Sequence, residues 1–479
     1  MRQTDEHTLY EHLAHDLANA IRRQVYRVGE RMPSIREISG RYRVSRSTVI
    51  QAYMRLEDEG LVYARPRAGH FVSEHALELP RLRPRSSEPV EVTVGRLSME
   101  LMGDAAVEGL KNFGAGFPSG DLLPLDKLAA ITARVAHAQA ELPAEYGALG
   151  GLPELRTQLA RRAAAAGIGC GPEDVTVCNG GAEALTVAIR AVAKPGDVIA
   201  VESPTYFGVL QVIESLGMRS VEIATHPRGG MDLDALARVL RETPVKAVAA
   251  MPGLSNPLGC SMSEERKQAL VRLLTDAEVP LIEDDVYGDL VFEHPRPRAA
   301  KAFDTEGNVI YLSSFSKTVA PGYRLGWIVA GRYTEQVQYL KFLATLTTAS
   351  LPQLVVAELL RQGGYEKVTR YATGIYRNRL IKARQWVLEY FPPGTVTSTP
   401  AGGYFLWVAL PPGVDGVELH QLAMQQRIRI TPGVLFSPSN LYSNYIRISC
   451  AQVHGEAARA AIQRLGELVA RLQGRVRVA

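Results

Sequence analysis

Several features that define other protein classes are scarce or missing in this chain of 479 residues. It has only four cysteines, and no two have the spacing of a zinc site or a redox pair, so we expect reduced thiols in a cytoplasmic protein and no metal centre. No apolar run could span a bilayer, and the first residues contain no apolar stretch, so we expect no membrane segment and no signal peptide. The length predicts roughly three domains.

Lysine is absent from the first hundred residues, and arginine carries the positive charge there. Between positions 31 and 55, six arginines accompany a single acidic residue, Glu37. Such a cluster suits contacts with phosphate groups, although a solvated helix face gives the same pattern. We therefore expect nucleic-acid binding, with a helical protein-interaction module as the alternative.

Helix and strand signals in the N-terminal segment predict a winged helix-turn-helix. Apolar residues recur every four positions in the first helix, and Ser34 with Glu37 forms a capping box for the second. Ser45 is placed to cap the third helix, which has the position of a recognition helix. The expected helices are 9–25, 34–41 and 46–59, and the expected strands are 61–65 and 70–72, on either side of a turn.

This segment resembles the DNA-binding domain of GntR-type bacterial regulators. The resemblance rests on residues 9–10, 33–37 (Pro-Ser-Ile-Arg-Glu), 44–49 (Val-Ser-Arg-Ser-Thr-Val), 52–53, 56–57 and 60–61. Met32 and His70 depart from the family, which often has leucine and a small residue there. The resemblance implies double-stranded DNA as a partner, with candidate contacts from Ser34, Arg36, Ser45, Arg46, Ser47, Thr48, Arg65, Arg67 and Gly69.

A basic segment rich in proline separates the DNA-binding segment from the rest of the chain. Residues 79–89 contain three prolines and no helical or strand periodicity, which is typical of a semi-extended linker. We expect a DNA-binding domain at 1–76, a linker at 77–100 and the remaining fold at 101–479.

Short apolar strands alternate with helical stretches after the linker, which predicts an α/β fold around a mostly parallel sheet. The expected strands are 175–177, 198–202, 247–251, 280–283, 309–312 and 327–330. Because ligands bind beyond the carboxyl ends of strands in such sheets, the residues that follow each strand are candidate site residues.

The stretch after the strand at 309–312 has the chemistry of an aldehyde cofactor site. Lys317 can form a Schiff base if its amine loses its proton, and Ser314, Ser316 and Arg324 suit a phosphate group. Pyridoxal phosphate carries both an aldehyde and a phosphate. A solvated lysine in a loop is the alternative that this motif leaves open.

Four other strand ends supply groups that complement this cofactor. Glycines before the helix at 181 leave amides free for a phosphate, and Tyr206 can stack on a ring. Asn256 can donate to a phenolic oxygen. Asp284, at the end of a buried strand, requires a cation, and a protonated pyridine nitrogen would provide one.

From about residue 112 to 449 this set resembles the fold-type I, class I/II aminotransferases. The resemblance implies a pyridoxal 5'-phosphate Schiff base to Lys317, with Asp284 on the ring nitrogen and Arg447 on a substrate α-carboxylate. Further implied cofactor contacts are Gly181, Ala182, Tyr206, Asn256, Tyr287, Ser314, Ser316, Arg324 and, from the partner subunit of a homodimer, Tyr146; Gly116 is implied to contact substrate. The implied large part is about 125–345, and the smaller α+β part is 346–479 with 101–124.

The combination of the two domains resembles the MocR-type regulators. It implies a transcriptional regulator that senses pyridoxal phosphate or its aldimine with an amino acid or amine. The alternative is an active aminotransferase that acts on an α-amino acid and carries an accessory DNA-binding arm, because every group that catalysis needs is present in the sequence. A winged helix serves no catalytic purpose, which favours regulation.

Overall fold

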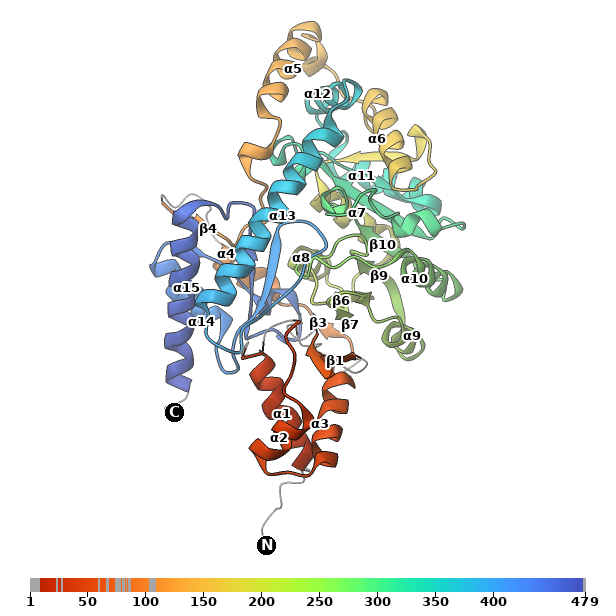
Figure 1. Ribbon diagram of the computed structural model, residues 1–479. Coiled ribbons are helices and arrows are strands. Elements are labelled where there is room, and N and C mark those ends of the chain that lie inside the picture. Colours follow the sequence, from red (N-terminus) through yellow and green to blue (C-terminus); the bar gives the residue numbers. More distant parts are fainter. Residues whose placement is uncertain are drawn as a thin grey trace.

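The computed structural model describes residues 9–22, 25–26, 29–58, 61–65, 69–73, 79, 82, 84, 88–102 and 109–476. The DNA-binding segment (red) lies at one end of the molecule in Figure 1, beside a large sheet-containing domain and a smaller domain. Arg67 and the rest of the expected turn at 66–68 lie outside the described residues. No described helix is long and apolar enough to cross a membrane.

The N-terminal segment folds as three helices and a hairpin, which confirms the expected winged helix-turn-helix. Ser34 caps α2 through the predicted capping box: its hydroxyl accepts from Glu37 N at 3.3 Å, and Glu37 Oε2 accepts from Ser34 N at 2.7 Å. Leu17, Ile38 and Leu56 meet in its core. The elements are α1 Leu9–Arg22, α2 Ile35–Tyr42, α3 Arg46–Asp58, β1 Val62–Arg65 and β2 Gly69–Val72.

The large domain is built on one mixed sheet of nine strands. Its order is β3-β7-β6-β9-β10-β11-β12-β5, with β8 paired to β7. The five strands from β7 to β11 run parallel to one another, as expected. The strands are β3 Val90–Glu91, β5 Val175–Cys178, β6 Val198–Ser203, β7 Arg219–His226, β8 Gly230–Met231, β9 Val245–Ala250, β10 Leu281–Asp284, β11 Val309–Ser314 and β12 Gly326–Val329.

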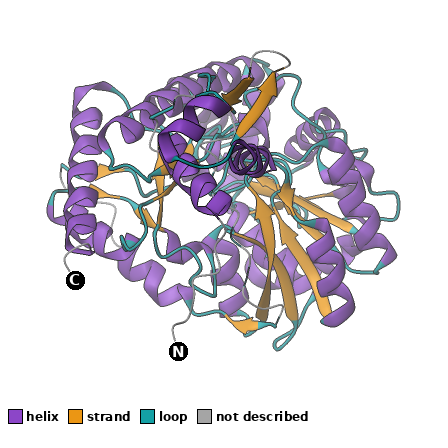
Figure 2. Ribbon diagram, turned by 60° about the horizontal axis from the view of Figure 1, so that its bottom comes forward, coloured by secondary structure: helices purple, strands orange, loops and turns teal. Residues whose placement is uncertain are grey.

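Helices cover both faces of this sheet because its strands are apolar on both sides. In β6, Ile199 and Val201 face one cluster with α7, α8 and α11, while Val198 and Ala200 face another with α9 and α10. Figure 2 shows the strands lying between these helix layers. The helices are α5 Leu125–Ala138, α6 Pro153–Ala165, α7 Gly181–Val192, α8 Phe207–Ser215, α9 Leu233–Glu242, α10 Glu264–Asp276, α11 Thr334–Thr345 and α12 Ser350–Arg361.

Two strands differ from the sequence-based expectation. β12 runs antiparallel to both neighbours, β11 and β5, so its amino end lies at the edge where the other strands end. β7 was not predicted, although Val221, Ile223 and Thr225 alternate with Ser220, Glu222 and Ala224. One of these, Glu222, is buried and accepts a hydrogen bond from Ser203 Oγ at 2.7 Å. Because the buried Glu222 interrupts the apolar run, the pattern that predicts a buried strand is absent from β7.

The small domain packs three helices on an antiparallel sheet of order β13-β14-β17-β16. A separate parallel pair joins β15 to β4. Helix α13 spans both domains: Tyr365 packs in a large-domain cluster, and Leu380 packs in the small-domain core (Figure 1). The elements are β4 Lys111–Asn112, α13 Tyr365–Tyr390, β13 Val396–Thr397, β14 Phe405–Ala409, α14 Gly416–Gln425, β15 Ile428–Arg429, β16 Thr431–Pro432, β17 Tyr445–Ser449 and α15 Gly455–Val476.

Two expected boundaries lie elsewhere in the structure. Helix α12, assigned to the small part by the boundary at 346, packs on α5 and α6 of the large domain through Val355 and Leu359. The end of the expected linker at 77–100 is folded as β3 and as α4 Val94–Met102, which packs on α8. Leu79, also in the expected linker, is 6% exposed against Trp407 and Tyr442. Tertiary contacts order segments that carry little secondary-structure signal of their own.

The first prediction concerns the N-terminal core. Leu56→Ala removes a side chain that is 0% exposed, so it should lower the free energy of unfolding of this domain by about 2–5 kcal/mol. Ile50→Ala, on the same helix but 44% exposed, should change it by less than about 0.5 kcal/mol. Hydrogen exchange of the α3 amides in the full chain measures both, and equal exchange rates in the two variants would contradict the packing described.

Candidate functional site

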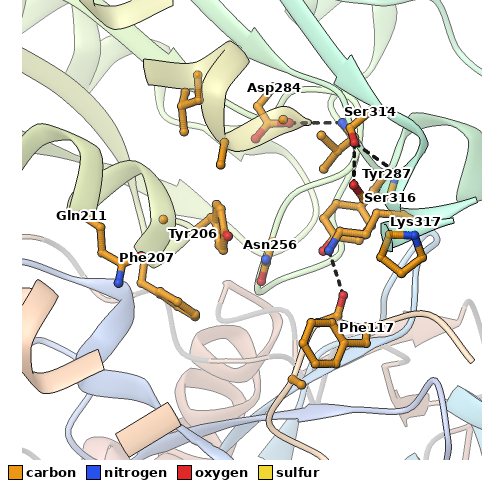
Figure 3. Close-up of a pocket in the computed structure, with 18 of the residues that line it drawn as sticks. Phe117, Tyr206, Phe207, Gln211, Asn256, Asp284, Tyr287, Ser314, Ser316 and Lys317 are labelled. Carbon is orange, nitrogen blue, oxygen red and sulfur yellow. Dashed lines mark hydrogen bonds between the residues drawn. The ribbon is translucent and has the colours of Figure 1, made fainter. Parts of the chain in front are cut away.

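A cavity of about 990 Å³ lies where the parallel strands end and the small domain meets the large one. Figure 3 shows Tyr206, Asn256, Asp284, Tyr287 and Lys317 around it. Twelve of the residues predicted for cofactor or substrate line this one cavity: Gly116, Gly181, Ala182, Tyr206, Asn256, Asp284, Tyr287, Ser314, Ser316, Lys317, Arg324 and Arg447. The packing of the two domains therefore brings together residues that are more than 300 positions apart in the chain.

The amino end of α7 forms one wall of the cavity. Gly180 precedes the helix with φ 85° and offers no side-chain cap, so the first amides of α7 stay open at Gly181 and Ala182. A Cβ on Gly180 would lie 2.4 Å from Nη2 of Arg324, so only glycine lets this guanidinium approach the turn. The turn has the open amides and the nearby cation that a phosphate group requires.

Two serines and Arg324 complete this cradle. Ser314 ends β11, and its Oγ accepts from Ser316 N at 3.0 Å and donates to Ser316 Oγ at 2.9 Å. Arg324 Nη1 donates to Ser316 Oγ at 3.3 Å, and its Nη2 donates to Asn179 O at 3.3 Å. The backbone of Arg324 has φ 52°, in the left-handed region, and directs the chain into β12. Hydroxyls, amides and a guanidinium thus converge on one end of the cavity.

Lys317 lies in the middle of the cavity wall, on the short turn after β11. Its Nζ donates to Gly116 O at 2.8 Å, and Tyr404 donates to the same oxygen at 2.9 Å. Burial, together with the charges of Arg447 and Arg324, lowers the pKa of the Lys317 amine to about 8, against the opposing effect of Asp284. About a tenth of this amine is therefore neutral and nucleophilic at pH 7, far more than for a lysine of ordinary pKa.

Asp284 ends β10 and is 9% exposed. Burial raises the pKa of its carboxyl group to about 7, opposed by a hydrogen bond from Val286 N at 3.1 Å. A buried carboxylate at this position is stabilised by a cation that enters the cavity. The protonated ring nitrogen of pyridoxal phosphate is such a cation, so the buried acid, the phosphate cradle and the amine all fit this cofactor.

Arg447, on β17, is 1% exposed and enters the cavity from the small domain. Its Nη1 donates to Asn256 Oδ1 at 2.9 Å, and its Nη2 donates to Gly114 O at 2.7 Å. The guanidinium lies 4.2 Å from the centroid of the Phe405 ring. Burial lowers its pKa to about 10, which leaves it charged at neutral pH. Its planar donors can hold a carboxylate with two parallel hydrogen bonds.

Tyr146 is the one predicted cofactor residue that does not line the cavity of its own chain. It is 85% exposed, whereas Tyr287, predicted for the ring hydroxyl, is 5% exposed inside the cavity. Gly116 lies under the same tyrosine: a Cβ added there would be 3.7 Å from Tyr287 Oη and 3.3 Å from Phe405 Cζ. A side chain at Gly116 would therefore crowd the space beside Lys317.

Several lining residues escaped the sequence analysis. Phe207 follows the predicted Tyr206, so its position next to a strand end could have indicated it. Ser98 and Met99 could not have been found, because they lie on α4, in the segment expected to be a linker. Arg429 belongs to a two-residue strand without a strand signal of its own. The other unpredicted lining residues include Asn112, Phe117, Gln211, Ser215, Met251 and Pro321.

Seven of the predicted DNA contacts are exposed at the starts of α2 and α3 and on the hairpin, whereas Thr48 is half-buried and Arg67 lies outside the described residues. Arg36, Arg46 and Ser47 are exposed, and Ser45 Oγ accepts from Thr48 N at 3.1 Å, as a helix cap does. Arg65 stacks on the Phe71 ring of the hairpin at 4.7 Å. The remaining candidates Ser34 and Gly69 are also exposed.

Comparison with known proteins agrees with this geometry. The model of aminotransferases of class I and II matches residues 109–465, and that of the gntR family of bacterial regulatory proteins matches residues 9–72. The structure of LysN, an α-aminoadipate aminotransferase from Thermus thermophilus complexed with N-(5'-phosphopyridoxyl)-L-leucine, is similar to this chain with a TM-score of 0.73. The two chains are 27% identical, and the match covers 80% of this chain and 95% of that one. The fold and the cavity thus define a class I and II aminotransferase domain that carries a GntR DNA-binding domain.

Two relatives match this chain across both of its domains. The chain is 34% identical over 466 residues to the uncharacterized HTH-type transcriptional regulator YjiR of Escherichia coli, across 97% of this chain and 99% of that protein. It is also 34% identical to the uncharacterized regulator YdcR of the same organism, across 96% of this chain and 98% of that protein. The chain belongs to the MocR-type subfamily of GntR transcriptional regulators.

Proposed function

We propose that this regulator holds pyridoxal 5'-phosphate through Lys317 and changes its DNA binding when an amino acid or amine reacts at the cofactor. The observation that carries the proposal is the position of α4. This helix follows the connection from the DNA-binding domain and forms part of the cavity wall through Ser98 and Met99. A ligand that fills the cavity therefore meets the segment that leads to the winged helix.

Contacts around α4 support this coupling. Glu214 Oε2, on α8, accepts from Gly95 N at 2.7 Å and so holds the first turn of α4. Gln211 Nε2, one helical turn earlier on α8, donates to Ser98 Oγ at 2.5 Å and also lines the cavity. Leu101, at the end of α4, packs in the same apolar cluster as Leu79 of the connection. These contacts join the cavity wall, α4 and Leu79 of the connection into one packed unit.

We infer the following roles for the cavity residues, and their positions support them. The α7 amides with Ser314, Ser316 and Arg324 would hold the phosphate, and Asp284 would pair with the ring nitrogen. When bound, the cofactor supplies an aldehyde for amine exchange and a ring that accepts electrons. Tyr206 would stack on the ring, while Asn256 and Tyr287 would contact the ring hydroxyl. Arg447 would orient an incoming amino acid by its α-carboxylate, and the neutral amine of Lys317 would accept or return a proton near Cα.

Aminotransferase activity remains the second candidate function. The specific observation in its favour is that Lys317, Asp284 and Arg447 line one cavity, whereas a sensor of the cofactor alone would not require the carboxylate-binding arginine. Keto-acid-dependent turnover of an amino acid would establish this activity. A spectral change without turnover, accompanied by altered DNA affinity, supports the sensor.

We also infer that the protein acts as a homodimer in the cytoplasm, where it has access to DNA. Tyr146 is exposed and outside its own cavity, which suits a residue that completes the phosphate site of a second copy. Two winged helices in one dimer would read two half-sites of an operator.

The pH dependence of cofactor attachment tests the role of Lys317. Because only the neutral amine attacks the aldehyde, the initial rate of imine formation should rise about tenfold between pH 7 and pH 9 and level off above its pKa of about 8. Absorbance after mixing the cofactor-free protein with pyridoxal phosphate measures this rate. Lys317→Ala should abolish attachment. A rate that keeps rising in proportion to hydroxide up to pH 10 would indicate a lysine of ordinary pKa and contradict the assignment.

The contact between α4 and α8 tests the sensor function. Glu214→Ala removes the acceptor for Gly95 N, so it should leave the cofactor spectrum unchanged but reduce the amino-acid-induced change in DNA affinity at least threefold. Asp276→Ala, on the exposed end of α10, is the matched control and should change neither. Fluorescence anisotropy with DNA from upstream of the gene measures affinity. An unaltered ligand response in Glu214→Ala would refute coupling through α4.

The salt dependence of DNA binding tests the predicted recognition helix. Arg46 is exposed at the start of α3, so Arg46→Ala should weaken binding and reduce the slope of log affinity against log salt by about one. Arg55, at the other end of α3, pairs with Glu11 at 2.9 Å, and Arg55→Ala should leave the slope unchanged. If the slope of log affinity against log salt were the same in the two variants, Arg46 would not contact the DNA.

A further inference from the structure

Tyr404 is a fully buried tyrosine whose hydroxyl group has no role in the function proposed above. It precedes β14, is 0% exposed and lies edge-on to Tyr287, with 5.8 Å between the two ring centroids. Its hydroxyl donates to Gly116 O at 2.9 Å, and the same oxygen accepts from Lys317 Nζ at 2.8 Å. Burial raises the pKa of this hydroxyl well above its ordinary value, so it keeps the proton that it donates. One carbonyl oxygen thus accepts from the reactive lysine and from a tyrosine of the small domain.

The chain around Gly116 depends on such side-chain contacts. Backbone bonds attach the preceding residues to the small domain as far as Phe113, whose N–H donates to Arg429 O at 2.9 Å and whose oxygen accepts from Ser449 N at 2.7 Å. Gly116 lies beyond these bonds, in a stretch that is neither helix nor strand and that lines the cavity. The two donors to Gly116 O therefore hold this part of the cavity wall.

The same arrangement occurs two residues earlier in the chain. Gly114 O accepts from Arg447 Nη2 at 2.7 Å and from Thr431 Oγ1 at 2.8 Å. In the proposed function, Arg447 engages an amino acid and Lys317 engages the cofactor aldehyde. Each carbonyl thus has one donor that reacts with or binds a ligand and a second donor, a hydroxyl group, that does neither.

Reaction with an aldehyde reduces what Lys317 can donate. The neutral amine gives up both hydrogens, which leave with the aldehyde oxygen as water while a C=N bond forms. The nitrogen then carries at most one added proton, and the ring hydroxyl next to the aldehyde of pyridoxal phosphate competes for it. Tyr404 keeps its hydrogen throughout, so it can replace Lys317 as the donor that holds Gly116 O.

We propose that Tyr404 is a positioning residue that holds Gly116 at the cavity when Lys317 is bound to the cofactor. Ala115 and Phe117, on either side of Gly116, line the cavity as well. An amino acid would therefore meet the same wall before and after Lys317 has reacted. This inference rests on the proposed function, because it concerns the protein with cofactor attached to Lys317.

Two amides report on how firmly the chain is held on each side of Gly116. Ala115 N donates to Asn112 Oδ1 at 2.9 Å, and Ser119 N donates to Tyr376 Oη at 3.2 Å. Hydrogen exchange of these amides, measured in the full chain, rises when the chain between them loosens.

A first experiment tests the shared acceptor in cofactor-free protein. Tyr404→Phe and Lys317→Met each leave one donor on Gly116 O, so both amides should exchange within about twofold of the native rate. The double variant leaves neither donor and should exchange at least about fivefold faster than the native protein. A double variant that exchanges no faster than the single variants would overturn the inference.

A second experiment tests the role of Tyr404 after loading with pyridoxal phosphate. The ratio of the exchange rate in Tyr404→Phe to the native rate should be below about two without the cofactor and at least about five with it. Taking this ratio removes any general protection by the cofactor, and the mass after borohydride reduction confirms attachment in each sample. A merely structural role would give the same ratio in both states and would overturn the inference.

Tyr376→Phe is the matched control, because it also removes a hydroxyl group that bonds this stretch. It should raise exchange at Ser119 by the same factor with and without the cofactor, and it should leave Ala115 unchanged. A cofactor-dependent ratio as large as that of Tyr404→Phe would show general loosening of the stretch and overturn the role of Tyr404.

Failure of this inference can be distinguished from failure of the proposed function. A native protein in which borohydride fixes no cofactor to Lys317 would overturn the proposed function and the inference with it. Attachment to Lys317 in native protein and in Tyr404→Phe, with an exchange ratio that does not depend on the cofactor, would overturn only the role of Tyr404.

Discussion

The burial of opposite charges at one edge of the large sheet is the constraint on which the site depends. Asp284 and Lys317 follow adjacent parallel strands, and burial shifts their pKa values toward each other, to about 7 and about 8. Each group is less stable in its charged form here than in water, so the acid favours a ligand that supplies a cation, and the amine is more readily available in its neutral, nucleophilic form. Pyridoxal phosphate offers a cationic ring nitrogen for the acid and an aldehyde for the amine.

The same edge brings the small domain and the connecting segment into contact with the chemistry. Arg447 reaches the cavity from β17 and is fixed by Asn256 of the large domain, so the two domains share one hydrogen-bonded unit at the site. Helix α4 closes another side of the cavity. A regulator requires a cavity that several segments line together. A ligand can shift a DNA-binding equilibrium only if its contacts differ between the two conformations of the protein.

Local sequence patterns were sufficient to predict elements that are stabilised by neighbouring residues or that are buried on both faces. The Ser34–Glu37 capping box forms as expected because both of its partners lie within one turn. The apolar runs of β6 and β11 are buried on both faces, so their composition alone indicates strands. Lys317 and Asp284 could be predicted as neighbours because parallel strands end at the same edge.

Other features depend on long-range packing that no local pattern carries. β7 contains the buried Glu222, which is stabilised by a hydrogen bond from Ser203 on the adjacent strand. Helix α4 lies largely in a stretch expected to be a linker, and its contacts with α8 order it. Arg429 enters the cavity only because β15 pairs with β4, more than 300 residues earlier in the chain. Residue type and spacing therefore indicate the two domains, the cofactor class and its lysine, since those signals are short-range. The wall that an effector would meet is assembled from distant segments, and only their packing in three dimensions brings those side chains together.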